Sequence, residues 1–274
     1  MTVDPETLRA ELGAGLLCFP ITHAREDFGL DEGRYREHVA WQSSFPAAAL
    51  FAAAGTGEFP ALTPPEIGQA IRAAVAASTV PVIAPAGYGT ADAVAMACDA
   101  EEVGAAGVFL LPTYLAVLPP DALAAHVRDV CAATAVAVIV HDRDGLVPRL
   151  ADDCPNLVAF PAPHDDGLPD VHTRLRGTLP TTCGQIVNFA PRFAHDLDTA
   201  MREGDSVAVY RKLEEFVLPY LEIRDRRPGY GIATVKAALA ALGRPAGPVR
   251  PPLTDLTATE VGELKALLDK VNVA

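Results

Sequence analysis

The 274-residue sequence predicts one (β/α) barrel of the TIM type that is degenerate, with one β/α unit shortened or missing, followed by a C-terminal helical extension. Three observations predict this fold. Short apolar runs rich in β-forming residues recur at regular intervals, and helical patterns separate them, as in parallel sheets. The runs are apolar throughout, which is typical of strands buried on both faces. No glycine-rich fingerprint follows the first run, so a barrel is favoured over a dinucleotide-binding sheet.

Each apolar run is an expected barrel strand. The six runs are Gly15–Phe19, Ala48–Ala52, Val80–Ala84, Gly107–Leu111, Val136–Val140 and Leu157–Phe160. Helices are expected between them at Asp31–Gln42, Pro64–Ala77, Ala91–Val103 and Pro120–Ala133. The helix that begins at Pro64 has the clearest start signal, because Thr63 precedes it and Glu66 follows three residues later, as in a capping box.

The regular pattern ends after Phe160. One further strand is expected at Leu179–Gly184, but the interval is too short for a complete helix–strand–helix passage. One barrel strand is therefore hidden in this stretch or absent, and we expect residues 161–180 or a second subunit to cover the exposed sheet edges. We expect residues 1–189 to form the barrel and residues 190–274 to add its last helix and the extension. The helices expected there are Ala190–Glu203, Ser206–Arg224, Tyr230–Leu242 and Thr257–Val271.

Composition excludes several classes of protein. The net charge of −13 argues against nucleic acid and anionic membrane surfaces as partners. Five cysteines without a C-x-x-C pair argue against a disulfide framework or a zinc ribbon and fit a cytoplasmic protein. The first residues contain acids and no apolar core, so we do not expect a signal peptide there.

Several motifs resemble the dihydrodipicolinate synthase and N-acetylneuraminate lyase superfamily, and within it the 5-dehydro-4-deoxyglucarate dehydratases. The resemblance covers residues 15–145 and 185–270. It is carried by Gly15-Leu-Leu-Cys-Phe-Pro-Ile-Thr22, Phe51-Ala-Ala-Ala-Gly-Thr-Gly-Glu-Phe59, Leu110-Leu-Pro-Thr-Tyr-Leu115, Ile223-Arg-Asp-Arg-Arg-Pro-Gly-Tyr230 and Gly247-Pro-Val-Arg-Pro-Pro-Leu-Thr-Asp-Leu256. It implies a TIM barrel, a lyase that needs no cofactor, a small keto acid as ligand, and a homo-oligomer, either a dimer or a tetramer.

The resemblance also implies a departure from the family's chemistry. The family forms a Schiff base through a lysine in a Gly-Phe-Lys-Asp motif, and the matching residue here is Pro161. Proline has no amine, so an imine cannot form at that position. The family's proton-relaying tyrosine corresponds to His141, and histidine as a residue type has an ordinary pKa near 6.5, whereas that of tyrosine is near 10. The protein is therefore expected to resemble a hydro-lyase or aldolase without performing the standard reaction.

The turn Gly55-Thr56-Gly57-Glu58 follows a strand and precedes a helix. Its backbone amides and the Thr56 hydroxyl are expected to bind a carboxylate, since ligand sites lie at this face of a barrel. The other interpretation is a plain connecting turn. Tyr114 is a further catalytic candidate, because the family's equivalent tyrosine reaches a neighbouring subunit's site, although a buried interface tyrosine is the simpler interpretation.

Two charged segments follow neighbouring strands. His141, Asp142, His164 and Asp165 could converge on a divalent cation, but the spacing matches no tight motif and a solvated rim with paired Asp142 and Arg143 is favoured. We therefore expect no metal. Arg224, Arg226 and Arg227 could bind a dicarboxylate or pair with other segments. Lys236 has apolar neighbours, and a structural role is favoured over one as a nucleophile. Cys18 and Cys183 are expected to be small core residues.

Three functions remain open. The protein could belong to the dehydratase-like lyases in sequence only. It could be a repurposed keto-acid or hydroxy-acid enzyme that uses His141, Glu58 and a metal. It could also be a non-catalytic or regulatory relative that retains a carboxylate-binding turn.

Overall fold

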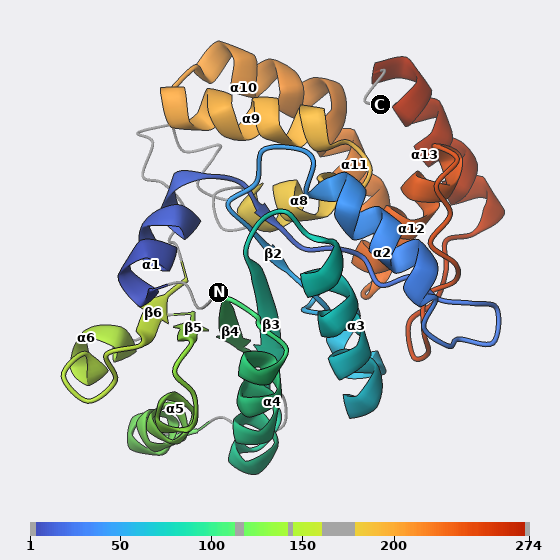
Figure 1. Ribbon diagram of the computed structural model, residues 1–274. Coiled ribbons are helices and arrows are strands. Elements are labelled where there is room, and N and C mark those ends of the chain that lie inside the picture. Colours follow the sequence, from blue (N-terminus) through green and yellow to red (C-terminus); the bar gives the residue numbers. More distant parts are fainter. Residues whose placement is uncertain (1–3, 113–117, 142–144, 161–178, 272–274) are drawn as a thin grey trace.

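A six-stranded parallel sheet forms the centre of the protein in a computed structural model that describes residues 4–112, 118–141, 145–160 and 179–271 (Figure 1). The strands follow one another in the order β1-β2-β3-β4-β5-β6, so each pairs with its neighbours in sequence. They are β1 (Leu17–Cys18), β2 (Ala49–Phe51), β3 (Val82–Ala86), β4 (Gly107–Leu110), β5 (Ala137–Val140) and β6 (Leu157–Ala159). The described strands form an open half-barrel, which confirms the predicted degenerate barrel.

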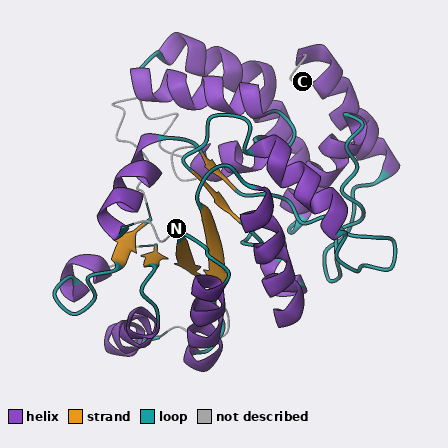
Figure 2. Cartoon of the chain, viewed as in Figure 1, coloured by secondary structure: helices purple, strands orange, loops and turns teal. Residues whose placement is uncertain are grey.

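Helices cover the outside of this sheet, and most of its strand residues are buried (Figure 2). The sequence-predicted helices between strands are present with bounds that differ by one residue or not at all. They are α2 (Glu32–Gln42), α3 (Pro64–Ala77), α4 (Thr90–Glu102) and α5 (Pro120–Ala133). Two further helices lie where no element was expected, α1 (Pro5–Ala14) before the sheet and the short α6 (Leu146–Leu150). At the start of α3, Glu66 Oε2 accepts hydrogen bonds from the Thr63 backbone N–H at 3.0 Å and from its hydroxyl at 2.9 Å.

The strand predicted at Leu179–Gly184 is wrong, because these residues begin helix α8 (Leu179–Ile186). Its buried residues Cys183, Ile186 and Val187 recur at helical spacing, and this burial overrides the strand preference of the threonines before them. α8 packs against β1. Gly184 permits the approach, since a Cβ there would lie 2.8 Å from the Phe19 ring.

Asn188 forms hydrogen bonds with backbone groups of the residues that directly follow β1, on the side of the strand that faces away from β2. Its Oδ1 accepts a hydrogen bond from the Ile21 N–H at 2.7 Å, and its Nδ2 donates to the Phe19 carbonyl at 3.0 Å. Such unpaired groups at a sheet edge would otherwise invite pairing with another chain. This side is thus covered by residues 179–188. Most of the 161–180 segment that was expected to cover the sheet edges lies outside the described residues, so that expectation stays a prediction. On the opposite side of the sheet, α1 lies beside β6 (Figure 1).

The C-terminal part is helical, as predicted. It comprises α9 (Pro191–Glu203), α10 (Ser206–Lys212), the π-helical turn η3 (Leu213–Val217), α11 (Leu218–Arg224), α12 (Tyr230–Ala241) and α13 (Ala258–Val271). The π-turn has a local cause: Pro219 has no N–H to donate, and the Leu218 N–H reaches back five residues to the Leu213 carbonyl. Among the described residues, no helix combines the length and hydropathy needed to cross a membrane.

Candidate functional site

The turn after β2 adopts a strained conformation. Ala53 and Glu58 have left-handed φ angles of 49° and 62°, which residues with a Cβ rarely adopt. Gly57 is required by close packing, because a Cβ there would lie 2.7 Å from the Ala53 Cα, whereas a Cβ on Gly55 would meet open space. Strain of this kind is concentrated at ligand-binding sites and switch regions. The turn therefore remains the first candidate for a binding site.

Three carbonyl groups of this turn accept hydrogen bonds within the protein, whereas several of its N–H groups donate none to the described residues. The Ala54 and Gly55 carbonyls accept from the Phe59 and Glu58 N–H groups, each at 3.2 Å, and the Gly57 carbonyl accepts from the Thr22 hydroxyl at 2.6 Å. Among the described residues, no group accepts a hydrogen bond from the amides at positions 55–57. Consecutive free N–H groups are the donors that bind an anion.

Glu58 turns its side chain into the protein. Its Oε1 lies 2.6 Å from the Lys236 Nζ, and the two side chains are 1 % and 2 % exposed. The same ammonium donates to the Pro248 carbonyl at 2.7 Å, while Glu58 Oε2 accepts from the Arg250 N–H at 2.7 Å. Burial lowers the pKa of Lys236, and the charge of Glu58 opposes this shift. Both residues are thus committed to an internal ion pair that joins the β2 turn to α12. Through Pro248 and Arg250, the pair also contacts the loop between α12 and α13, called here the C-terminal loop.

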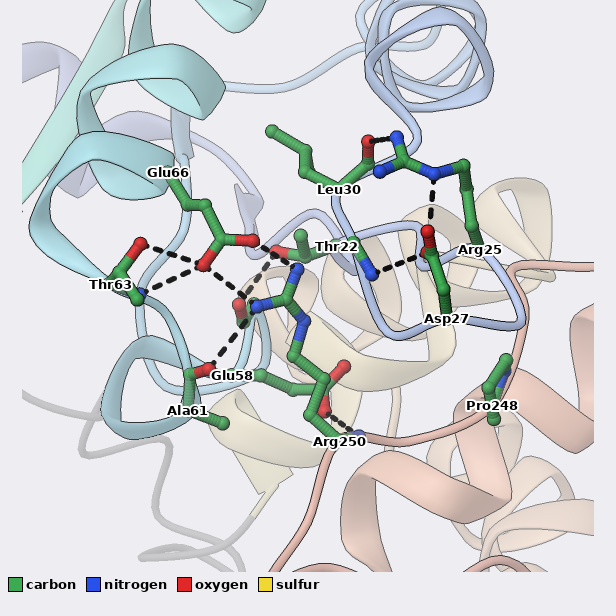
Figure 3. Close-up of polar contacts among 12 residues, drawn as sticks. Thr22, Arg25, Asp27, Leu30, Glu58, Ala61, Thr63, Glu66, Pro248 and Arg250 are labelled. Atoms are coloured by element: carbon green, nitrogen blue, oxygen red, sulfur yellow. Dashed lines mark hydrogen bonds and ion pairs between the residues drawn. The ribbon is translucent and has the colours of Figure 1, made fainter.

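The Arg250 side chain continues this network toward α3 (Figure 3). Its two terminal nitrogens contact the two carboxylate oxygens of Glu66 at 2.7 and 2.9 Å, and one of them also lies 3.3 Å from the Ala61 carbonyl. Hydrogen bonds from Arg250 lower the pKa of Glu66 to about 2. A planar, bidentate pair of this kind fixes direction as well as distance. The C-terminal loop is therefore held against both ends of the segment that follows β2.

Aromatic rings fill the interior of the sheet below these strand ends. Phe51 stacks on Phe19 with ring centroids 4.7 Å apart, and contacts Phe109 and Phe160 at 5.3 and 5.7 Å. The exposed His141, just after β5, lies 4.6 Å from the Phe160 ring and 5.2 Å from Phe109. His141 thus lies beside the Phe109 and Phe160 rings, at the end of the sheet that also carries the β2 turn.

All four lysines of the chain lie in described segments, and none follows a strand. Lys212 on α10 lies 3.6 Å from the Asp196 carboxylate, and Lys265 and Lys270 are exposed on α13. Lys236 on α12 is the buried partner of Glu58, which agrees with the structural role favoured from sequence.

Several predicted site residues lie outside the described part of the chain. They are Tyr114, Asp142, Arg143, Pro161, His164 and Asp165. Three of the four possible metal ligands are among them, so the predicted absence of a metal stays a prediction. Within the described residues, no group of three or more histidine, cysteine or acidic side chains is arranged to hold a metal ion.

The arginines after α11 contact other groups of the protein. Arg224 pairs with Asp225 and Arg226 with Glu263, while Arg227 lies over the Tyr230 ring with 5.6 Å between its Cζ and the centroid.

Two buried cysteines behave as core residues. Burial raises the pKa of both Cys18 and Cys183 to about 12, so neither thiol is a ready nucleophile.

Two features of this face were not predicted from the sequence. Thr22 and Arg250 belong to the network around the β2 turn and lie in segments that carry the family resemblance, but nothing in those segments indicates that they contact this turn. Tyr88, just after β3, has a left-handed φ of 67° and stacks on Phe59 with centroids 4.9 Å apart. The glycines on either side of Tyr88 were the one available signal for a strained turn.

Comparison with known proteins identifies the class to which this fold and site belong. Residues 13–166 match the dihydrodipicolinate synthetase family, and the chain belongs to that family of lyases. Among its relatives it is similar to probable 5-dehydro-4-deoxyglucarate dehydratases. The protein from Rhodococcus opacus is 44 % identical over 99 % of this chain and 100 % of its own length, and that from Saccharopolyspora erythraea is 46 % identical over 96 % of both.

Solved structures agree on the fold. Dihydrodipicolinate synthase from Bacillus clausii superposes with a TM-score of 0.82 at 23 % identity, covering 96 % of this chain and 99 % of its own. YagE from Escherichia coli, a member of the same family solved in complex with pyruvate, gives a TM-score of 0.77 at 20 % identity over 95 % and 99 % of the two chains.

The full-length comparison also supports the loss of a unit. The Rhodococcus opacus alignment spans 307 positions, whereas this chain has 274 residues, so at least 33 positions of the alignment have no residue here.

Proposed function

We propose that this protein binds a small carboxylate or keto acid without covalent catalysis, as a family member that has lost the Schiff-base reaction. One observation carries the proposal: the β2 turn presents three amides with no acceptor among the described residues, while every lysine of the chain is placed elsewhere. The assignment of Pro161 to the position of the family's lysine supports it. Lys236 does not substitute for that lysine, because its ammonium is shared between Glu58 and the Pro248 carbonyl.

Trapping with borohydride tests the loss of covalent chemistry. The protein is incubated with pyruvate and sodium borohydride, and its intact mass is measured beside that of a relative that carries the family's lysine. We expect a reduced adduct on the relative and an unchanged mass for this protein. A stable adduct here would refute the proposal, and peptide mapping would then identify the lysine.

Calorimetry tests the binding step. We expect pyruvate, 2-oxoglutarate or a sugar diacid to bind, and Thr56→Val to weaken binding about tenfold, because a hydrogen bond to a charged group contributes roughly 1.5–3 kcal/mol. Val207→Ala serves as a control, since Val207 is exposed on α10, away from the turn. Absence of binding by all three acids would remove this function.

His141 favours a second candidate, a repurposed enzyme that moves a proton without an imine. Its imidazole is exposed at the end of β5 beside the Phe109 and Phe160 rings, and imidazole is a common general acid or base in enzymes. Exchange of the pyruvate methyl protons with deuterium, followed by NMR, tests this activity. Protein-dependent exchange that His141→Phe abolishes would support the enzyme over the binding protein.

A further inference from the structure

We propose that Lys236 is a positioning residue for the carboxylate-binding turn, which it holds by neutralising and tethering Glu58. This inference rests on the proposed binding function and assigns a role to a lysine that lies outside the turn. Lys236 is on α12 and Glu58 ends the turn after β2, so their ion pair connects parts of the chain that are distant in sequence.

The geometry of Glu58 requires a tether. Its backbone is in a left-handed conformation, which a residue with a Cβ keeps only where surrounding contacts offset the strain. Its carboxylate is fixed on both oxygens, by Lys236 Nζ at 2.6 Å and by the Arg250 N–H at 2.7 Å. The backbone of residue 58 is therefore tethered from the C-terminal side of the molecule.

Thr22 is the other anchor of the turn. Its hydroxyl donates to the Gly57 carbonyl at 2.6 Å and so fixes the peptide group directly before Glu58. The Ala54 and Gly55 carbonyls are also occupied, while the amides at positions 55–57 have no acceptor among the described residues. Release of Glu58 would allow these peptides to rotate and present carbonyl oxygen, which repels a carboxylate.

The negative charge of Glu58 also requires compensation. Glu58 is 1 % exposed and directly follows the proposed anion site, so an unneutralised carboxylate there would disfavour an anionic ligand. Arg250 offers its backbone N–H to Glu58, but its guanidinium is committed to Glu66. Lys236 is thus the cation that compensates Glu58. Removal of the Lys236 charge should therefore weaken carboxylate binding more than disorder of the β2 turn would by itself.

The test combines single and double variants with pyruvate as the probe. We expect Lys236→Met to raise the calorimetric Kd for pyruvate at least tenfold. The double variant Lys236→Met/Glu58→Gln removes the uncompensated charge but also lacks the tether, and we expect its Kd to lie between those of the wild type and of Lys236→Met. Lys265→Met, on the exposed face of α13, is the matched control and should leave the Kd unchanged.

The outcomes separate positioning from simple stabilisation. A Lys236→Met protein that melts at a lower temperature but binds pyruvate with the wild-type Kd would overturn the inference, as would a double variant as weak as the single one. If Lys236→Met does not fold, Lys236→Arg and Glu58→Gln are measured instead. We then expect the arginine, which keeps the positive charge, to bind more tightly than Glu58→Gln, and the reverse order would overturn the inference.

Failure of the underlying function gives a different result. If the wild type binds no carboxylate, the proposed function fails, and hydrogen exchange still tests the positioning role. The Glu58 and Phe59 amides close the turn through bonds to Gly55 and Ala54. We expect them to exchange at least tenfold faster in Lys236→Met than in Lys265→Met, and equal rates would exclude a role for Lys236 in ordering the turn.

Discussion

The β1–β3 side and the β5–β6 side of the sheet differ in how their surroundings are built. On the first side, Thr22, Glu58, Lys236 and Arg250 hold the turn after β2, and Asn188 satisfies the backbone beyond β1. On the second side, α6 has five residues, whereas α2 to α5 have 11 to 14. His141 and Pro161, which the resemblance matches to the family's tyrosine and lysine, follow β5 and β6 in the sequence. In the proposed function, ligand binding and the family's covalent chemistry therefore depend on different strands, so one can change while the other is retained.

Two asparagines provide the strongest test of this difference. We expect Asn188→Leu to lower the free energy of unfolding by roughly 3 kcal/mol or more, since it leaves the buried Ile21 N–H unpaired and removes bonds to His38 and Phe19. Asn156, beside β6, also donates to three carbonyls but is partly exposed, so water can replace it and Asn156→Leu should lose less. Urea titration measures both. Equal losses would break the comparison.

Acid should destabilise the protein through the β1–β3 side. Burial lowers the pKa of His23 to about 3 and that of His38 to about 4, from an ordinary 6.5. The folded state keeps both rings neutral, so this stability is complete above pH 6.5 and is lost as the pH falls toward 4. The free energy of unfolding should fall by up to about 1.4 kcal/mol per pH unit for each histidine. Urea midpoints measured between pH 7 and pH 5 test this, and an unchanged slope in His38→Gln would contradict it.

The two glycines of the β2 turn form a matched pair. Gly57→Ala places a methyl group against the Ala53 backbone and should cost about 2 kcal/mol while weakening pyruvate binding strongly. Gly55→Ala meets open space and should change stability little. Thermal unfolding and calorimetry on both variants test whether this turn is as tightly packed as its contacts indicate. A Gly57→Ala protein as stable as Gly55→Ala would show that it is not.

The smallest effect is expected on the other side of the sheet. His141→Phe should change pyruvate affinity by less than about 0.5 kcal/mol, because an exposed side chain away from the turn contributes little. Calorimetry at pH 7 measures this affinity. A loss of tenfold or more would make His141 part of the ligand site and would remove the contrast between the two sides.

Most of the sheet and its helices were predictable because their signals are local. The apolar runs contained the six described strands apart from the last two residues of β3, and the capping box placed the start of α3 at Pro64. Leu179–Gly184 failed because threonines favour strands, whereas packing against β1 selects a helix there. α6 is too short to give a periodic signal.

The candidate site was predictable only in part. The Gly-Thr-Gly sequence marked the β2 turn, since glycine in a strand-to-helix connection is a local feature. The contacts that hold this turn come from residues 22, 236 and 250, and no sequence spacing indicates that such distant residues meet. Glu58 was expected as a pocket residue, yet its charge is used inside the protein, and only three-dimensional packing could reveal that use.

Asn188 has a consequence for any attempt to close the sheet into a full barrel. One carboxamide supplies the donor and the acceptor that a neighbouring strand would offer to the chain around Phe19 and Ile21. A grafted strand would compete with that amide and with α8 for the same space. Closing the barrel would therefore require removal of α8 as well as addition of a strand, because the sheet edge at β1 is already covered.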